Sequence, residues 1–190
     1  MATLHISEIF KLVGGAADAR DKALLLKKYE SAQLKQYLYI STCNAVEFAI
    51  PPEPATYIPF DVPVEQGETN LFREAKKLQY FLKNAMPGLQ QAKRERLYTD
   101  LLSRLSKEEA QAMEDIRLRQ LDKKYGISRS VVERAFSDVA QWLAKYSKPE
   151  EKPKPVLNAA GKVPRKTQKM IAEKPTQALS QQEIIDKVLK

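Results

Sequence analysis

Apolar side chains recur at steps of three and four residues along most of the first 147 positions, which is the pattern of helices that bury one face. Small polar residues that cap helices precede several of these runs, and glycine or proline follows some of them. The pattern predicts helices that begin near Ser7, Asp18, Ser31, Asn70, Lys93 and Ser106. The last of these is predicted to start with a capping box, formed by Ser106 and Glu109, and to continue to about Lys124. We therefore predict a mainly α fold in which residues 1–147 form one compact helical domain.

A tight turn between two helices is the most specific local signal, and it lies in residues 116–146. Gly126 follows a helical run and can adopt the left-handed backbone conformation that ends a helix, while Ser128 can cap the next helix. The apolar residues after this turn recur at alternating steps of four and three; they are Val132, Phe136, Val139, Leu143 and Tyr146. This spacing predicts one long helix with a single buried face.

Residues 41–70 lack the helical period and are rich in proline. Aromatic and branched apolar residues alternate with the prolines, so the segment has side chains to bury without being able to form a helix. We predict an extended Pro-rich loop that crosses the surface of the helical body, with one possible short strand at residues 45–50.

Beyond Ser147 the composition changes, and two further segments are predicted. Residues 148–179 are rich in proline and charge, contain no aromatic residue and are predicted to be a disordered basic linker. Residues 180–190 are predicted to form a short amphipathic helix, because Ser180 and Glu183 have the spacing of a capping box. Its apolar stripe, which is suited to binding a partner protein, consists of Ile184, Ile185, Val188 and Leu189.

The formal net charge is +8, and the basic excess is concentrated in the tail. Residues 148–190 hold ten basic and five acidic side chains, so the tail carries +5 and the first 147 residues carry only +3. One cluster in the tail could neutralise phosphate groups without sequence preference: Lys162, Arg165, Lys166 and Lys169. The alternative is that this cluster only keeps a linker soluble.

No run of 18 or more apolar residues is present, and Glu8 interrupts the apolar stretch that a signal peptide would need. A single Cys43 cannot form an intramolecular disulfide. These features favour a cytoplasmic protein.

The predicted helix, turn and helix resemble the spacing of a DNA-binding helix-turn-helix motif. In that interpretation Arg129 or Arg134 would read guanine in the major groove, and Ser128 or Ser130 would bind phosphate. Asp122 argues against it, because the motif usually has a small residue at that position. The alternative is a helix-turn-helix that serves only to close the fold.

Enzymatic chemistry has little support in the sequence. His5 is the only histidine, Cys43 the only cysteine, and no glycine-rich phosphate-binding loop exists. The acidic pairs Glu108–Glu109 and Glu114–Asp115 are predicted near helix starts or on exposed faces, where the helix dipole accounts for them. We predict a non-enzymatic protein with no metal site and no cofactor.

Several stretches together resemble a family of small uncharacterised proteins encoded by tailed bacteriophages, mainly large contractile-tailed phages and cyanophages. The matching stretches are SEIFKLV, SAQLKQYL, VEFAIPP, LFREAKKLQYFL, RERLYTDLL and KKYGISRSVVERAF, within residues 7–143. Members of that family carry proline after the Ala-Phe pair, whereas Ser137 follows Phe136 here, which predicts that the last helix continues toward Trp142. The resemblance implies a phage origin and expression in the cytoplasm of an infected bacterium, and it implies no catalytic residue.

Two functions remain open on these grounds. The first is a non-enzymatic phage accessory protein that associates with nucleic acid, possibly DNA, or with the replication and transcription machinery. The second is a protein-interaction module without a nucleic-acid role, which is a host-takeover factor, an anti-defence factor or a minor virion component. In the second case the terminal helix would bind a host or phage protein.

Overall fold

The computed structural model describes residues 4–53, 55–83 and 85–146. The predicted linker and terminal helix lie outside the described residues. So do the candidate residues in them: Lys162, Arg165, Lys166, Lys169, Ile184, Ile185, Val188 and Leu189. The described part is mainly helical and contains no β-strand.

Three helices open the chain: α1 (Ile6–Gly15), α2 (Ala19–Lys28) and α3 (Ala32–Thr42). Ser31 caps α3 as predicted, because its side chain accepts a hydrogen bond from the Leu34 backbone N–H at 3.1 Å. The predicted cap at Ser7 is wrong. Helix α1 begins one residue earlier, and the Glu8 carboxylate accepts a hydrogen bond from the His5 backbone N–H at 2.7 Å.

Between α3 and the next full helical turn, the described residues have no regular secondary structure apart from the short 3-10 helix η1 (Val64–Gln66). The predicted strand at residues 45–50 is reduced to one isolated bridge between Phe48 and Leu82. Two further isolated bridges join Phe60 to Ser106 and Thr69 to Leu105.

The helix predicted from Asn70 is present but is not regular. It consists of α4 (Leu71–Glu74), the 3-10 turn η2 (Ala75–Lys77) and α5 (Leu78–Phe81). The Asn70 side chain caps it by accepting a hydrogen bond from the Arg73 N–H at 3.0 Å. The longer helices α6 (Gln91–Arg104) and α7 (Lys107–Arg117) follow.

Helix α7 ends at Arg117, although the sequence pattern predicted continuation to about Lys124. Arg119 adopts a left-handed backbone conformation with φ 55°, and its guanidinium donates to the carbonyls of Cys43 and Val46. Ending the helix here allows this contact and starts α8 (Leu121–Tyr125) in a new direction. Gly126 then ends α8 with φ 62°, as predicted.

The prediction of one long helix after Gly126 is wrong, and so is the prediction that Ser137 lets the helix continue. The chain forms α9 (Arg129–Ala135) and α10 (Ser137–Tyr146), separated by Phe136 in an extended conformation with φ −132° and ψ 104°. The break buries Phe136, which is 2% exposed, and α10 packs against both α9 and α3. Trp142 then meets the ring of Tyr39 edge to face, with centroids 6.0 Å apart.

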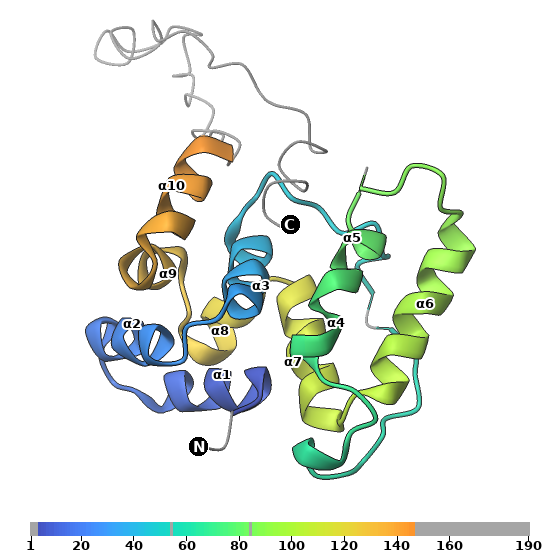
Figure 1. Ribbon diagram of the computed structural model, residues 1–190, viewed down its shortest axis with the longest axis horizontal. Coiled ribbons are helices and arrows are strands. Elements are labelled where there is room, and N and C mark those ends of the chain that lie inside the picture. Colours follow the sequence, from blue (N-terminus) through green and yellow to red (C-terminus); the bar gives the residue numbers. More distant parts are fainter. Residues whose placement is uncertain (1–3, 54, 84, 147–190) are drawn as a thin grey trace, which may run out of the picture.

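Figure 1 shows α1, α2, α8, α9 and α10 on one side of the molecule and α4, α5 and α6 on the other, with α3 and α7 between them. Helix α7 contacts α1, α3, α6 and η1, so it is central to the packing. The core is continuous across both sides and includes Phe10, Tyr37, Tyr39, Phe81 and Tyr98. No helix within the described ranges is long and apolar enough to cross a membrane.

Candidate functional site

Glu108 and Glu109 lie in the first turn of α7, as predicted, but three of the four acidic residues of this helix are buried, so the prediction that the acidic pairs need no partner beyond the helix dipole is wrong. Glu109 and Asp115 are 0% exposed and Glu114 is 5% exposed, whereas Glu108 stays partly exposed. Buried carboxylates destabilise a fold unless hydrogen bonds or ion pairs satisfy them, so their partners decide their role.

Glu109 joins the starts of two other helices. Its carboxylate accepts hydrogen bonds from the backbone N–H groups of Ser7 in α1, at 3.2 Å, and of Leu71 in α4, at 2.6 Å. First-turn N–H groups have no partner within their own helix, and a negative charge is favourable there. Burial nevertheless raises the pKa of Glu109, because it outweighs the lowering effect of these hydrogen bonds. Only half of the capping box predicted at Ser106 is formed. The Ser106 hydroxyl accepts a hydrogen bond from the Glu109 N–H, but the Glu109 carboxylate accepts from Ser7 and Leu71.

Glu114 and Arg117 form a buried ion pair that holds the Pro-rich segment. The pair is 2.8 Å long, and Glu114 also accepts hydrogen bonds from the Tyr98 hydroxyl at 2.6 Å and the Ala55 N–H at 3.2 Å. The Arg117 guanidinium donates to the backbone carbonyls of Pro51 and Glu53. Burial alone would raise the pKa of Glu114, but the hydrogen bonds from Arg117 and Tyr98 outweigh it, and the pKa lies below its ordinary value.

Asp115 connects α7 to α8. It accepts a hydrogen bond from the Tyr125 hydroxyl at 3.0 Å and forms an ion pair with Lys124. Burial, followed by the nearby charge of Asp115, raises the pKa of Tyr125 to about 12. Glu109 and Glu114 thus fasten segments that are distant in the sequence, Asp115 fastens the next helix, and we assign all three carboxylates a structural role.

The predicted DNA-reading residues lie at the start and on the outer side of α9. Ser128 precedes α9 at the capping position, but its side chain makes no cap and contacts the Ser130 hydroxyl at 2.9 Å. Arg129 pairs with Glu133 on the same helix at 2.7 Å. Arg134 is exposed and has no ion pair within the described residues. Of the two arginines predicted to read guanine, only Arg134 therefore has a guanidinium without an ion pair among the described residues.

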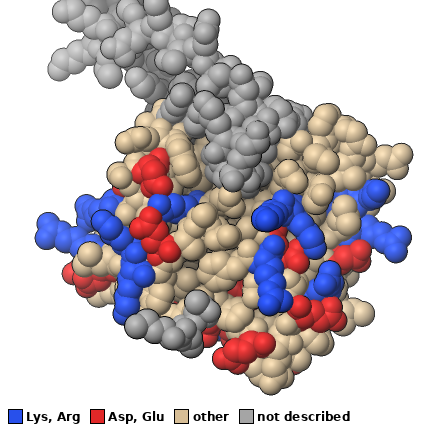
Figure 2. Space-filling model, in the orientation of Figure 1, with Lys and Arg blue, Asp and Glu red and all other residues tan. Residues whose placement is uncertain are grey.

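Helix α9 packs against α2, and α2 carries its own basic stripe. Arg20, Leu24, Lys27 and Lys28 are exposed and follow one another at helical spacing. None of these three cations forms an ion pair with a described residue. In Figure 2 Lys and Arg side chains lie over the part of the surface that α2 forms, with Asp and Glu side chains among them, and further Lys and Arg side chains lie on the other side of the molecule. We call Arg20, Lys27, Lys28 and Arg134 the α2–α9 face.

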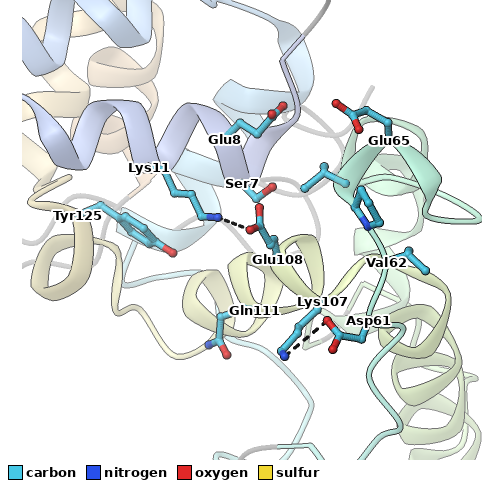
Figure 3. A pocket seen from close by; sticks show the side chains of 12 residues that line it. Ser7, Glu8, Lys11, Asp61, Val62, Glu65, Lys107, Glu108, Gln111 and Tyr125 are labelled. Atoms are coloured by element: carbon cyan, nitrogen blue, oxygen red, sulfur yellow. Dashed lines mark ion pairs between the residues drawn. The ribbon is translucent and has the colours of Figure 1, made fainter.

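A second feature is an open pocket of about 800 Å³ between α1, the segment 61–65 and α7 (Figure 3). Six charged side chains line it: Glu8, Lys11, Asp61, Glu65, Lys107 and Glu108. Two ion pairs cross its walls, Lys11–Glu108 at 2.5 Å and Lys107–Asp61 at 3.5 Å. We call it the α1–α7 pocket. Sequence reasoning missed it, because η1 has no periodic signal and Glu8 had been considered only as a break in an apolar run.

His5 and Cys43 lie in different parts of the fold. His5 precedes α1, and Cys43 is buried at the end of α3 with its thiol 3.4 Å from the Tyr39 hydroxyl. Within the described part of the chain, no cluster of three or more His, Cys, Asp or Glu residues could hold a metal ion.

These observations define an α-helical protein built around a central polar helix, α7, whose acidic side chains anchor its neighbours. Residues 9–123 match a family of unknown function, DUF6433, and this is more than half of the chain, so the protein belongs to that family. The matched range runs from α1 into α8 and stops before α9. No curated protein and no solved structure matches the chain significantly.

Proposed function

We propose that the protein is a non-enzymatic accessory protein that associates with nucleic acid through the α2–α9 face. The observation that carries the proposal is the packing of α9 against α2, which places Arg134 on the helix next to the exposed stripe of Arg20, Lys27 and Lys28. Cations without an acidic partner are available for phosphate groups, and a phosphate contact releases counterions into solution.

Within this proposal the α2–α9 face binds the phosphate backbone, and base reading is a minor contribution. The Arg129 guanidinium is paired with Glu133, and residues 128–137 carry only one net positive charge. The basic tail cluster at Lys162, Arg165, Lys166 and Lys169 would extend the binding surface along the same strand. The resemblance to small proteins of tailed bacteriophages supports a role in the cytoplasm of an infected bacterium.

The test uses the full chain and a fluorescently labelled 20-base-pair duplex in an anisotropy titration at several salt concentrations. The four cations of the α2–α9 face alone predict that the logarithm of the affinity falls against the logarithm of salt with a slope of about −3.6, and phosphate contacts from the tail cluster would make the slope steeper. The double substitution Lys27→Glu and Lys28→Glu should weaken binding at least about tenfold at low salt.

The matched control is Lys93→Glu with Arg96→Glu on α6, which makes the same change in net charge at two exposed positions away from α2. Equal weakening by the two double variants would show that only the net charge matters and would refute the α2–α9 face. An affinity that does not change with salt would refute a phosphate-backbone contact altogether.

A further inference from the structure

The α1–α7 pocket has an excess of negative charge in a protein that is basic overall. Its six charged lining residues comprise four carboxylates and two ammonium groups, and both lysines are already engaged in the ion pairs Lys11–Glu108 and Lys107–Asp61. Glu8 and Glu65 therefore have no cation as a partner among the described residues. Figure 3 shows their carboxylates pointing toward one another across the mouth of the pocket, from α1 and from η1. A positive group placed between them would be attracted by both carboxylates.

A buried hydroxyl provides a second, independent observation. Ser7 lines the pocket and is 2% exposed, yet its Oγ has no hydrogen-bond partner in the described part of the chain. The hydroxyl lies near enough to Glu109 to lower the pKa of that carboxyl, but it forms no hydrogen bond of normal geometry with it. A buried hydroxyl without a partner is unfavourable, and a ligand that supplies a donor would satisfy it.

The shape of the pocket indicates the class of the cation. The carboxylates are spread along a pocket of about 800 Å³ rather than converging on one point, and the described residues contain no metal-binding cluster. Val62, Pro63 and Val64 form an apolar part of the wall, against which an aliphatic stem can pack while its charged end reaches the carboxylates. We propose that the α1–α7 pocket binds a lysine or arginine side chain of a basic peptide segment on a partner protein.

The test measures binding of a labelled nine-residue peptide, in which arginine alternates with glycine and valine, to the full-length protein by fluorescence anisotropy at low salt. The matched peptide carries citrulline in place of arginine, which keeps the shape of the side chain and removes its charge. The arginine peptide should bind at least about tenfold more tightly, because a hydrogen bond to a charged group is stronger than a neutral one. Since the whole protein carries +8, its long-range field opposes this binding, and only a local acidic site can produce it.

Three variants locate the binding. Glu65→Gln removes an exposed carboxylate without a partner ion and should weaken binding about tenfold. Ser7→Ala should weaken it several-fold with little change in the melting temperature, because the hydroxyl forms no hydrogen bond of normal geometry within the described residues. Asp100→Asn, on α6 and outside the pocket, has the same charge change as Glu65→Gln and should have no effect.

The proposal is overturned if the arginine and citrulline peptides bind equally, or if Glu65→Gln and Asp100→Asn weaken binding to the same extent. Spermidine provides the last arm. If spermidine displaces the peptide at a concentration equal to the dissociation constant of the peptide, the pocket is a site for free polyamines and not for a basic peptide.

Discussion

The buried ion pair between Glu114 and Arg117 should make a measurable contribution to stability, and Glu114→Gln tests it. The substitution keeps the size of the side chain but removes its charge, and it replaces one of two acceptor oxygens by a donor. One carboxylate oxygen accepts from the Tyr98 hydroxyl and from Arg117 Nε, and the other accepts from the Ala55 N–H and a terminal guanidinium nitrogen of Arg117. In either orientation of the glutamine amide, two of these four donors lose their acceptor oxygen and face the amide NH₂ group instead.

The magnitude follows from what remains around Arg117. Its side chain is 1% exposed, so the variant leaves a buried guanidinium without its counter-ion. Removing one partner of a buried pair costs about 3–5 kcal/mol. The carbonyls of Pro51 and Glu53 still accept hydrogen bonds from the guanidinium, so we expect the lower end, about 3 kcal/mol. Glu108→Gln is the control, since it makes the same change on the same helix in a pair whose side chains are 54% and 42% exposed. That pair should contribute less than about 1 kcal/mol.

The assay is urea denaturation of the full-length chain, followed by the fluorescence of Trp142, which packs against Tyr39. The pKa of Glu114 is lowered on folding, so its stabilising contribution is present above its unfolded pKa and disappears as the pH falls through the lowered folded value. The difference between wild type and Glu114→Gln should therefore be constant near neutral pH and should shrink in acid. The reasoning is refuted if Glu114→Gln destabilises the protein no more than Glu108→Gln does.

Three further outcomes are expected in the same assay. Burial raises the pKa of Glu109, so the wild type should gain stability relative to Glu109→Gln as the pH falls through that raised value, which is the opposite trend. Ser137→Pro should be neutral or stabilise by up to about 1 kcal/mol, because Ser137 is the first residue of α10 and Phe136 before it is extended; in a continuous helix it would cost about 3 kcal/mol. Gly126→Ala should cost at least about 1–2 kcal/mol, because φ is 62° and the new methyl group would displace the Lys22 ammonium from the Tyr125 carbonyl.

The predictions that depend on local geometry were largely confirmed. Gly126 ends a helix in the left-handed conformation, Ser31 and Asn70 cap helices, and the apolar faces fall where periodicity placed them. Each of these signals is carried by a few adjacent residues, so a single sequence contains all the information needed.

The helix breaks at Arg119 and Phe136 were missed because distant residues cause them. The left-handed Arg119 is satisfied by carbonyls of Cys43 and Val46, more than 70 positions earlier in the chain. At Phe136 the apolar spacing of four and three continues unbroken through the gap, so periodicity could not distinguish one long helix from two short ones.

The burial of α7 was missed because its own composition is that of a surface helix. Between Lys107 and Arg117 the chain has only four apolar residues, Ala110, Ala112, Met113 and Ile116, and six charged ones. The charges are tolerated inside because first-turn N–H groups, backbone carbonyls and Tyr98 are all brought to them by other elements. No window of the sequence shows those partners, so the site could only be found from the folded chain.

The net charge of +8 favours binding to phosphate groups, and the cations of the α2–α9 face fit that expectation. The α1–α7 pocket does not fit it, because its lining has more carboxylates than ammonium groups. Charges act over about 10 Å at ordinary salt concentrations, so a ligand at the pocket responds most strongly to the carboxylates that line it, among them Glu8 and Glu65. Salt should therefore weaken both proposed interactions. Substitutions separate the two interactions, because Glu65→Gln should weaken peptide binding while making the protein slightly more favourable for duplex DNA. A variant set that moved both affinities in the same direction would mean that one surface serves both ligands, and that the division into two sites is wrong.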